Sequence, residues 1–129
     1  MRAPERLWAL RVVSTPEALD HAHYEGDVIV LRIASDDAIA IGAVHAELTD
    51  EHAIVEVEST FVGWDLDQTE FAEIVSRHVE WPLPTERPAL AQGLVAGLPL
   101  KFWIDHDRVL MISSNGLVHE VVDRLGVPA

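Results

Sequence analysis

The chain lacks cysteine and has a single lysine, Lys101, among its 129 residues. Without cysteine it has no disulfide bond, no thiolate metal site and no cysteine nucleophile. No apolar run reaches the roughly 18 residues of a membrane-spanning helix, so we expect no membrane partner. Nine basic residues stand against 22 acidic ones, and the net charge of −13 repels nucleic acid, whose phosphates bind clustered lysine and arginine.

The length suits one domain, residues 1–129, with a hydrophobic core of its own. No glycine-rich or serine-rich linker marks a boundary within it. The N-terminal residues carry charges and lack the long apolar stretch and small-residue cleavage site of an export signal. We therefore expect a cytoplasmic protein with an acidic, soluble surface.

The first half predicts a strand, a short helix and a hairpin. Residues 7–13 are apolar enough for the strand. Ser14 and Glu17 have the spacing of a capping box, which predicts a helix that begins here and ends near Gly26. Residues 28–42 are apolar on both sides of a Ser-Asp-Asp turn, which predicts a hairpin. Their nearly continuous apolar character indicates that both faces of the hairpin are covered.

Another strand is predicted where apolar and acidic residues alternate, in residues 53–59. Alternation of this kind is typical of a strand with one face toward the core. Val55 and Val57 are expected to face inward. Glu56 and Glu58 are expected to face water.

The clearest helix begins at Asp67. Asp67 and Glu70 are spaced as N-cap and third helical residue, and Leu66 can pack against Phe71 as a hydrophobic staple. Proline at positions 82 and 84 prevents the helix from continuing. The predicted core-facing stripe consists of Phe71, Ile74, Val75, His78 and Val79.

Two further strands, residues 90–95 and 98–104, are separated at Gly97. The segment Asp105-His106-Asp107 predicts a turn, and residues 108–113 return as a strand. The order of elements, β-α-β-β-β-α-β-β-β-α, indicates the α+β class. We expect a single compact domain with a mixed or antiparallel sheet and helices.

The last helix is expected to be capped by Ser114 or Asn115. Gly126 is expected to end it by adopting the left-handed conformation that other residues avoid. Its predicted core stripe consists of Leu117, Val118, Val121, Val122 and Leu125.

Several histidines are candidate metal ligands. His21 and His23 are two residues apart, a spacing that shares a face on a strand but diverges on a helix. They fall at the end of the predicted helix, and His45 and His52 lie elsewhere. We interpret all four as surface histidines and predict no metal site.

Two segments contain candidate catalytic groups. Asp105-His106-Asp107 has the composition of an acid-base cluster, because a carboxylate raises the basicity of a neighbouring histidine. Ser113–Ser114 and His119 offer a hydroxyl and an imidazole, but no G-x-S-x-G nucleophile motif is present. Turn formation and helix capping explain these residues more simply, so we assign no catalytic residue.

Gly93 and Gly97 frame the segment QGLVAG. A phosphate-binding loop would need backbone amides at the start of a helix, whereas strands flank this segment. A bulge or a close approach of another group to the backbone is the preferred interpretation.

Three of the four tryptophans lie after residue 60: Trp64, Trp81 and Trp103. Trp103 should point away from Phe102 and Ile104 in a regular strand. It then either packs in a second core layer or forms an exposed anchor for a partner.

Residues 59–103 contain three segments, FVGWDL, FAEIVSRHVEWPLP and ALAQGLVAGLPLKFW. Together they resemble the gamma subunit of heterotetrameric sarcosine oxidase, which is similar to the tetrahydrofolate-binding aminomethyltransferase of the glycine cleavage system, the T-protein. Residues 30–37 resemble the LRIAPDE-type hairpin of these proteins, so the resemblance covers residues 28–125. It implies a fold similar to the folate-binding aminomethyltransferase fold, with its ferredoxin-like repeat.

The gamma subunit of heterotetrameric sarcosine oxidase has no flavin or nicotinamide site and packs against larger subunits. No residue of this chain matches the catalytic aspartate of the aminomethyltransferases or a folate-contacting set. The resemblance therefore implies a non-catalytic accessory subunit of a flavin- and folate-linked, sarcosine-type amine oxidase. Its partners would be the larger oxidase subunits, and it would bind no cofactor alone.

Two alternatives remain open. In the first, the chain alone binds a folate-like molecule such as tetrahydrofolate, or acts as an aminomethyltransferase-like protein. Asp36, Asp37 or Glu56 would then hold the pterin amino groups, because carboxylates pair well with guanidine-like edges. In the second, exposed strand edges pair with a copy of the chain and form a homo-oligomer.

Overall fold

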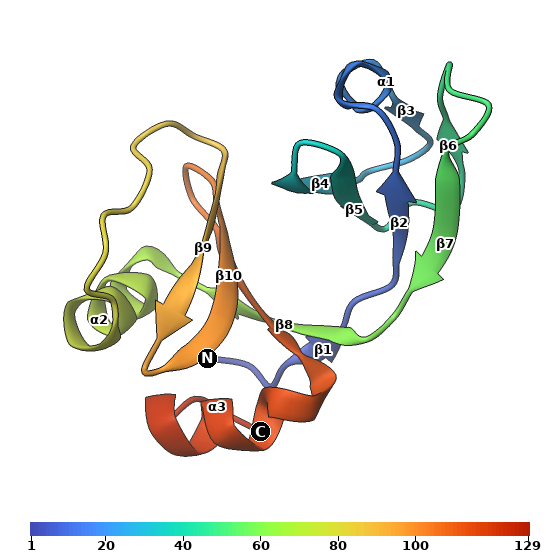
Figure 1. Cartoon of the computed structure of the whole chain (residues 1–129). Helices are drawn as coiled ribbons and strands as arrows, with labels where there is room; N and C mark the ends of the chain where they lie inside the picture. Colours follow the sequence, from blue (N-terminus) through green and yellow to red (C-terminus); the bar gives the residue numbers. More distant parts are fainter. The chain divides into compact units, whose positions relative to one another are not determined.

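The computed structural model describes residues 1–129 and divides into two compact units, one of residues 7–59 and one of residues 1–6 with 60–129. Both units combine antiparallel strands with few helices (Figure 1), which confirms the α+β class. A single domain over residues 1–129 stays a prediction.

The first unit contains a four-stranded antiparallel sheet in the order β4-β5-β2-β7 and a two-stranded sheet of β3 and β6. Strands β4 and β7 are therefore the edges of the larger sheet. The elements are β2 (Ala9–Val13), α1 (Pro16–Asp20), β3 (His23–Tyr24), β4 (Ile29–Ala34), β5 (Asp37–Ile41), β6 (Ala46–Glu47) and β7 (Ile54–Glu58).

One cluster of buried apolar residues lies on one face of the larger sheet of the first unit. Leu19 of α1 packs there with side chains of the two central strands, β2 and β5. Tyr24 and Leu48 pack against this cluster from its margin. The buried members are Leu10, Val12, Leu19, Ala38, Ala40 and Ala43.

Helix α1 begins and ends differently from the prediction. Its N-cap is Thr15, whose hydroxyl accepts a hydrogen bond from the Ala18 N–H at 3.2 Å. The predicted capping box of Ser14 and Glu17 is wrong, because the Ser14 hydroxyl instead donates to a carboxylate oxygen of Asp50 at 2.7 Å. The helix ends at Asp20 and not near Gly26, since β3 follows and pairs with β6.

The hairpin predicted over residues 28–42 is confirmed as β4 and β5. Three successive residues of β5, Ala38 to Ala40, are buried, so both faces of this central strand are covered as predicted. Strand β4 is an edge, and its Val30 is exposed. Coverage of both faces therefore holds for only one strand of the hairpin.

The second unit contains a five-stranded antiparallel sheet in the order β1-β8-β11-β10-β9. Its helices are α2 and α3, with a short 3-10 turn, η1, before α3. The elements are β1 (Glu5–Arg6), β8 (Phe61–Leu66), α2 (Gln68–His78), β9 (Ala89–Val95), β10 (Leu98–Ile104), β11 (Val109–Ser114), η1 (Asn115–Leu117) and α3 (Val118–Leu125).

Both helices of the second unit contribute to one core with alternate residues of the sheet. Phe71 of α2 contacts Phe102 of β10 edge-to-face, with ring centroids 5.2 Å apart. Val121 of α3 is fully buried in the same cluster. The predicted stripe of α3 is confirmed, because its remaining members pack against this core.

The ends of the two helices test the cap predictions. The capping box of Asp67 and Glu70 is confirmed, with both hydrogen bonds formed, at 2.8 and 2.9 Å. Gly126 ends α3 in the left-handed conformation, with φ of 70°, as predicted. A cap at Ser114 or Asn115 is wrong: η1 precedes α3, and neither helix start has a side-chain cap hydrogen bond.

Candidate binding surface

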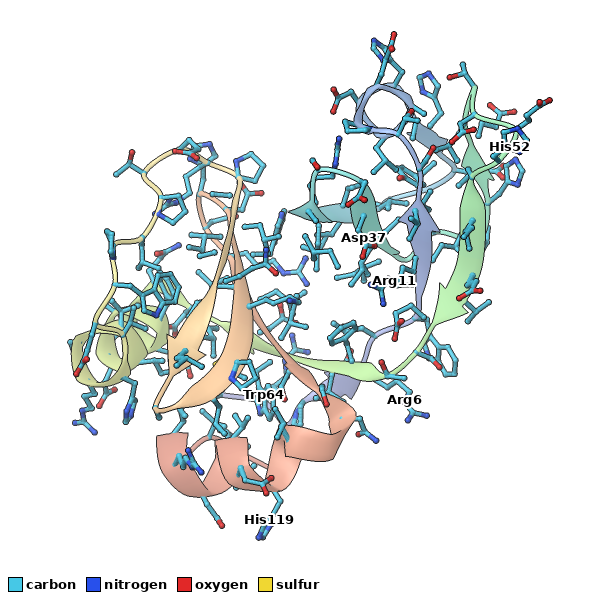
Figure 2. All side chains as sticks on the ribbon, viewed as in Figure 1. Arg6, Arg11, Asp37, His52, Trp64 and His119 are labelled. Carbon is cyan, nitrogen blue, oxygen red and sulfur yellow. The ribbon has the colours of Figure 1, made fainter.

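The histidines considered as metal ligands are only partly brought together. His23 and His45 line a cavity of about 310 Å³ with Tyr24. His21 instead places Nδ1 2.9 Å from the carbonyl oxygen of Glu17, one turn earlier. His52 lies in an exposed loop (Figure 2). No group of three or more histidine, aspartate or glutamate side chains is placed to hold a metal ion.

The segment considered as an acid-base cluster forms the predicted turn. The Asp105 N–H donates to the Arg108 carbonyl at 2.8 Å, and the Asp105 carboxylate accepts from the His106 N–H at 2.9 Å. The carboxylate thus stabilises its own turn and does not bond the His106 ring in this geometry.

The serine and histidine of the second candidate have separate partners. Ser113 is buried, and its hydroxyl donates to the Ser114 carbonyl at 2.7 Å. The His119 side chain is 86% exposed and lies 3.4 Å from Asp123 on the same helix. His119 extends away from α3 in Figure 2, so the two groups do not form a nucleophile-base pair.

Glycine is required at position 93 because the side chain of Trp81 lies close to the backbone there. This confirms the interpretation of Gly93 as a site where another group approaches the backbone closely. A Cβ at this position would lie 2.5 Å from the indole ring of Trp81. The Trp81 Nε1–H donates to the Leu94 carbonyl at 2.8 Å and holds the ring in place. Ala96 and Gly97 have φ of 51° and 80° and form the two-residue connection between β9 and β10.

The other two tryptophans occupy different environments. Trp64 is fully buried in the core, and its Nε1–H donates to the Pro128 carbonyl at 2.8 Å. Trp103 is half-buried and alternates with the buried Phe102 and Ile104, as predicted. The Arg108 guanidinium lies 5.9 Å from the centroid of the Trp103 ring.

Of the carboxylates considered for a pterin, Asp37 is already paired with a basic side chain. Arg11 donates to both Asp37 carboxylate oxygens, at 3.1 and 2.6 Å, and the two side chains point toward each other in Figure 2. Asp37 raises the pKa of Arg11 through these bonds and its charge, with smaller contributions from Glu58 and Glu56. Asp36 lies in the exposed turn between β4 and β5.

The exposed apolar side chains of β7 are the main departure from the sequence prediction. Ile54, Val55 and Val57 are 54%, 44% and 73% exposed. The two valines lie on the predicted face of the sheet, that of the apolar cluster, but the burial expected for them there is wrong. The apolar cluster covers the central strands β2 and β5, and β7 lies outside them. We call the five residues of this strand, Ile54–Glu58, the β7 edge.

The four edge strands of the two larger sheets differ in how open they are. Strand β1 has only two residues. Strand β4 has a register shift between Arg32 and Ala34, and bulges of this kind disfavour edge pairing. On β9, the Leu94 carbonyl already accepts from Trp81. The β7 edge pairs regularly with β2 over all five residues, and no strand follows it in the sheet.

The sequence gives no direct signal for this surface. Alternation in residues 53–59 indicates a strand with two unlike faces, but it does not tell whether the strand is central or at an edge. Edge position depends on pairing between β7 and the distant β2, which a local pattern does not contain.

None of the helices is long and apolar enough to span a bilayer. In comparisons with known proteins, no family model, no curated protein and no solved structure matched the chain.

Proposed function

We propose that this chain is a non-catalytic accessory subunit that binds the larger subunits of a flavin- and folate-linked, sarcosine-type amine oxidase. Within such a complex it would help to shape the channel in which folate receives a one-carbon unit. The proposal includes the fold: the chain would adopt a variant of the folate-binding aminomethyltransferase fold.

The resemblance to the gamma subunit supports the identity of the partner. Two of its segments lie on hairpins, residues 30–37 on β4–β5 and the segment ALAQGLVAGLPLKFW on β9–β10. Gly93 and Trp81, which both belong to the resembling segments, pack against each other. Packing between these two resembling positions is compatible with a subunit that contributes shape.

The observation that carries the binding role is the β7 edge. Strand β7 is regular and is the last strand of its sheet, and its large apolar side chains remain exposed. Such a surface favours association with another polypeptide. Val57 is the most exposed of these side chains. Association with a larger subunit would remove these side chains from water.

Reconstitution tests the proposal directly. The purified chain is mixed with the larger subunits of a heterotetrameric sarcosine oxidase and separated by size-exclusion chromatography. Co-elution supports the proposal, and separate elution contradicts it. A thermal shift of the chain alone on adding tetrahydrofolate would instead favour the stand-alone binder, because a ligand of the folded state raises its stability.

A further inference from the structure

We propose that the β7 edge binds an extended segment of the partner protein in which apolar and basic residues alternate, and that this segment adds a fifth strand to the four-stranded sheet. The proposal rests on the accessory role and deepens it, because it names the surface and the chemistry of the segment that is bound. Strand addition of this kind is a common mode of peptide recognition, in which main-chain hydrogen bonds give affinity and side chains give selectivity.

The backbone of the β7 edge is suited to a further strand. Its residues pair one-to-one with β2, from Ile54 opposite Val13 to Glu58 opposite Ala9, without a register shift. A regular strand directs its remaining N–H and C=O groups outward along one side. An incoming segment can therefore continue the antiparallel ladder.

The side chains of the β7 edge specify the composition of that segment. Val55 and Val57 lie on the face of the apolar cluster, since their register partners on β2 belong to it. Glu56 lies on the opposite face, across from Arg11. Residues directly opposite on neighbouring strands share a face, so the added strand would place apolar residues beside the valines and a basic residue beside Glu56.

The charges around Glu56 favour a basic segment. Arg11, its neighbour on β2, donates two hydrogen bonds to Asp37 and is thereby committed to another carboxylate. The chain as a whole carries a net charge of −13, which attracts basic segments and repels acidic ones.

A second copy of the chain fits the same edge poorly. In the antiparallel register that overlaps the whole strand, Glu56 would lie opposite Glu56 of the copy. Like charges directly opposite each other destabilise strand pairing. The large negative net charge of both copies adds to this repulsion.

Peptide binding to the full chain tests the inference. The probe is a short, end-capped peptide of alternating valine and lysine. One control peptide has glutamate in place of lysine, and another has proline in place of the central valines, because proline lacks the N–H that a strand donates. Affinity is measured by calorimetry, and the site by backbone amide chemical shifts.

We expect the basic peptide to shift the amides of residues 54–58 and to bind at least about tenfold more tightly than either control at low salt. Added salt should weaken its binding. Equal binding of the acidic peptide, shifts centred elsewhere, no binding to the folded chain, or dimerisation of the chain through β7 would each overturn the inference.

Two matched variants link this surface to the proposed function. Val57→Lys places a cation on the β7 edge, whereas Leu94→Lys makes the same change at an exposed position of the β9 edge. Val57→Lys should lower the affinity for both the basic peptide and the oxidase subunits by at least about tenfold, and Leu94→Lys should leave both unchanged. Circular dichroism verifies that both variants are folded.

The two proposals fail in different ways. If the oxidase subunits bind the wild-type chain and Val57→Lys equally well, strand addition at β7 is wrong and the accessory role stands. If the basic peptide binds at β7 but the oxidase subunits do not bind, the accessory role is wrong and the β7 surface stands.

Discussion

The indole ring of Trp81 lies directly against the backbone of Gly93. Any side chain at position 93 would overlap the ring, because even a Cβ would come within 2.5 Å of it. The same ring donates its N–H to the Leu94 carbonyl. One tryptophan therefore fixes the proline-containing segment after α2 to strand β9 and occupies a carbonyl of that strand.

Gly93→Ala is expected to destabilise the chain by about 1–3 kcal/mol, because overpacking displaces the Trp81 ring. The control is Gly116→Ala, where the nearest atom to a new Cβ is 3.7 Å away. Urea unfolding followed by circular dichroism measures both. Equal stability of Gly93→Ala and the wild type would contradict this packing.

Helix capping gives a second prediction with a matched control. Asp67→Ala removes one bond of the α2 capping box and should cost about 1 kcal/mol of unfolding free energy. Ser114→Ala, at a helix start without a side-chain cap bond, should change it by less than about 0.5 kcal/mol. Comparable losses in the two variants would mean that Ser114 caps its helix after all.

The valines of the first unit should differ sharply in their contribution to stability. Val12 is fully buried on β2, so Val12→Ala should cost about 2 kcal/mol. Val57 is mostly exposed, so Val57→Ala should cost less than about 0.5 kcal/mol. Thermal unfolding of the two variants checks this, and a large loss for Val57→Ala would show that its side chain is buried.

The stability of the fold should depend on pH through the carboxylate of Asp50. The Ser14 hydroxyl, and secondly the His52 N–H, donate to its carboxylate and lower its pKa. A carboxylate whose pKa is lower in the folded state stabilises the fold above its unfolded-state pKa of about 3.9, and this stabilisation is lost as the pH falls through the folded-state pKa.

Ser14→Ala should therefore raise the pKa of Asp50 toward its ordinary value, as measured by carbon-detected NMR titration of the side-chain carboxyl. It should also make the stability of the chain less dependent on pH in the acid range. An unchanged Asp50 pKa in Ser14→Ala would show that the hydroxyl does not hold the carboxylate.

The features that were predictable from the sequence are the local ones. The α2 capping box depends on two residues three positions apart, and the end of α3 depends on one glycine, so both could be predicted from neighbouring residues. The start of α1 differs from the sequence prediction because Ser14 hydrogen-bonds with Asp50, far along the chain. The close approach at Gly93 was expected, but its partner, Trp81, was not.

The candidate surface could not be predicted for a related reason. The alternation in β7 predicts a strand, yet the exposure of Val57 depends on the order of strands in the sheet. That order arises from pairings between segments far apart in the sequence. The pairing of Asp37 with Arg11 is of the same kind, and it occupies one carboxylate that had been considered for a pterin.

The function that we propose requires the chain to bind larger oxidase subunits through the β7 edge. Its most direct test is size-exclusion chromatography with light scattering on the chain mixed with those subunits, as wild type, Val57→Lys and Leu94→Lys. We predict a stable complex with the wild type and Leu94→Lys and its loss with Val57→Lys. A wild-type chain that elutes alone beside the oxidase subunits would contradict the claim.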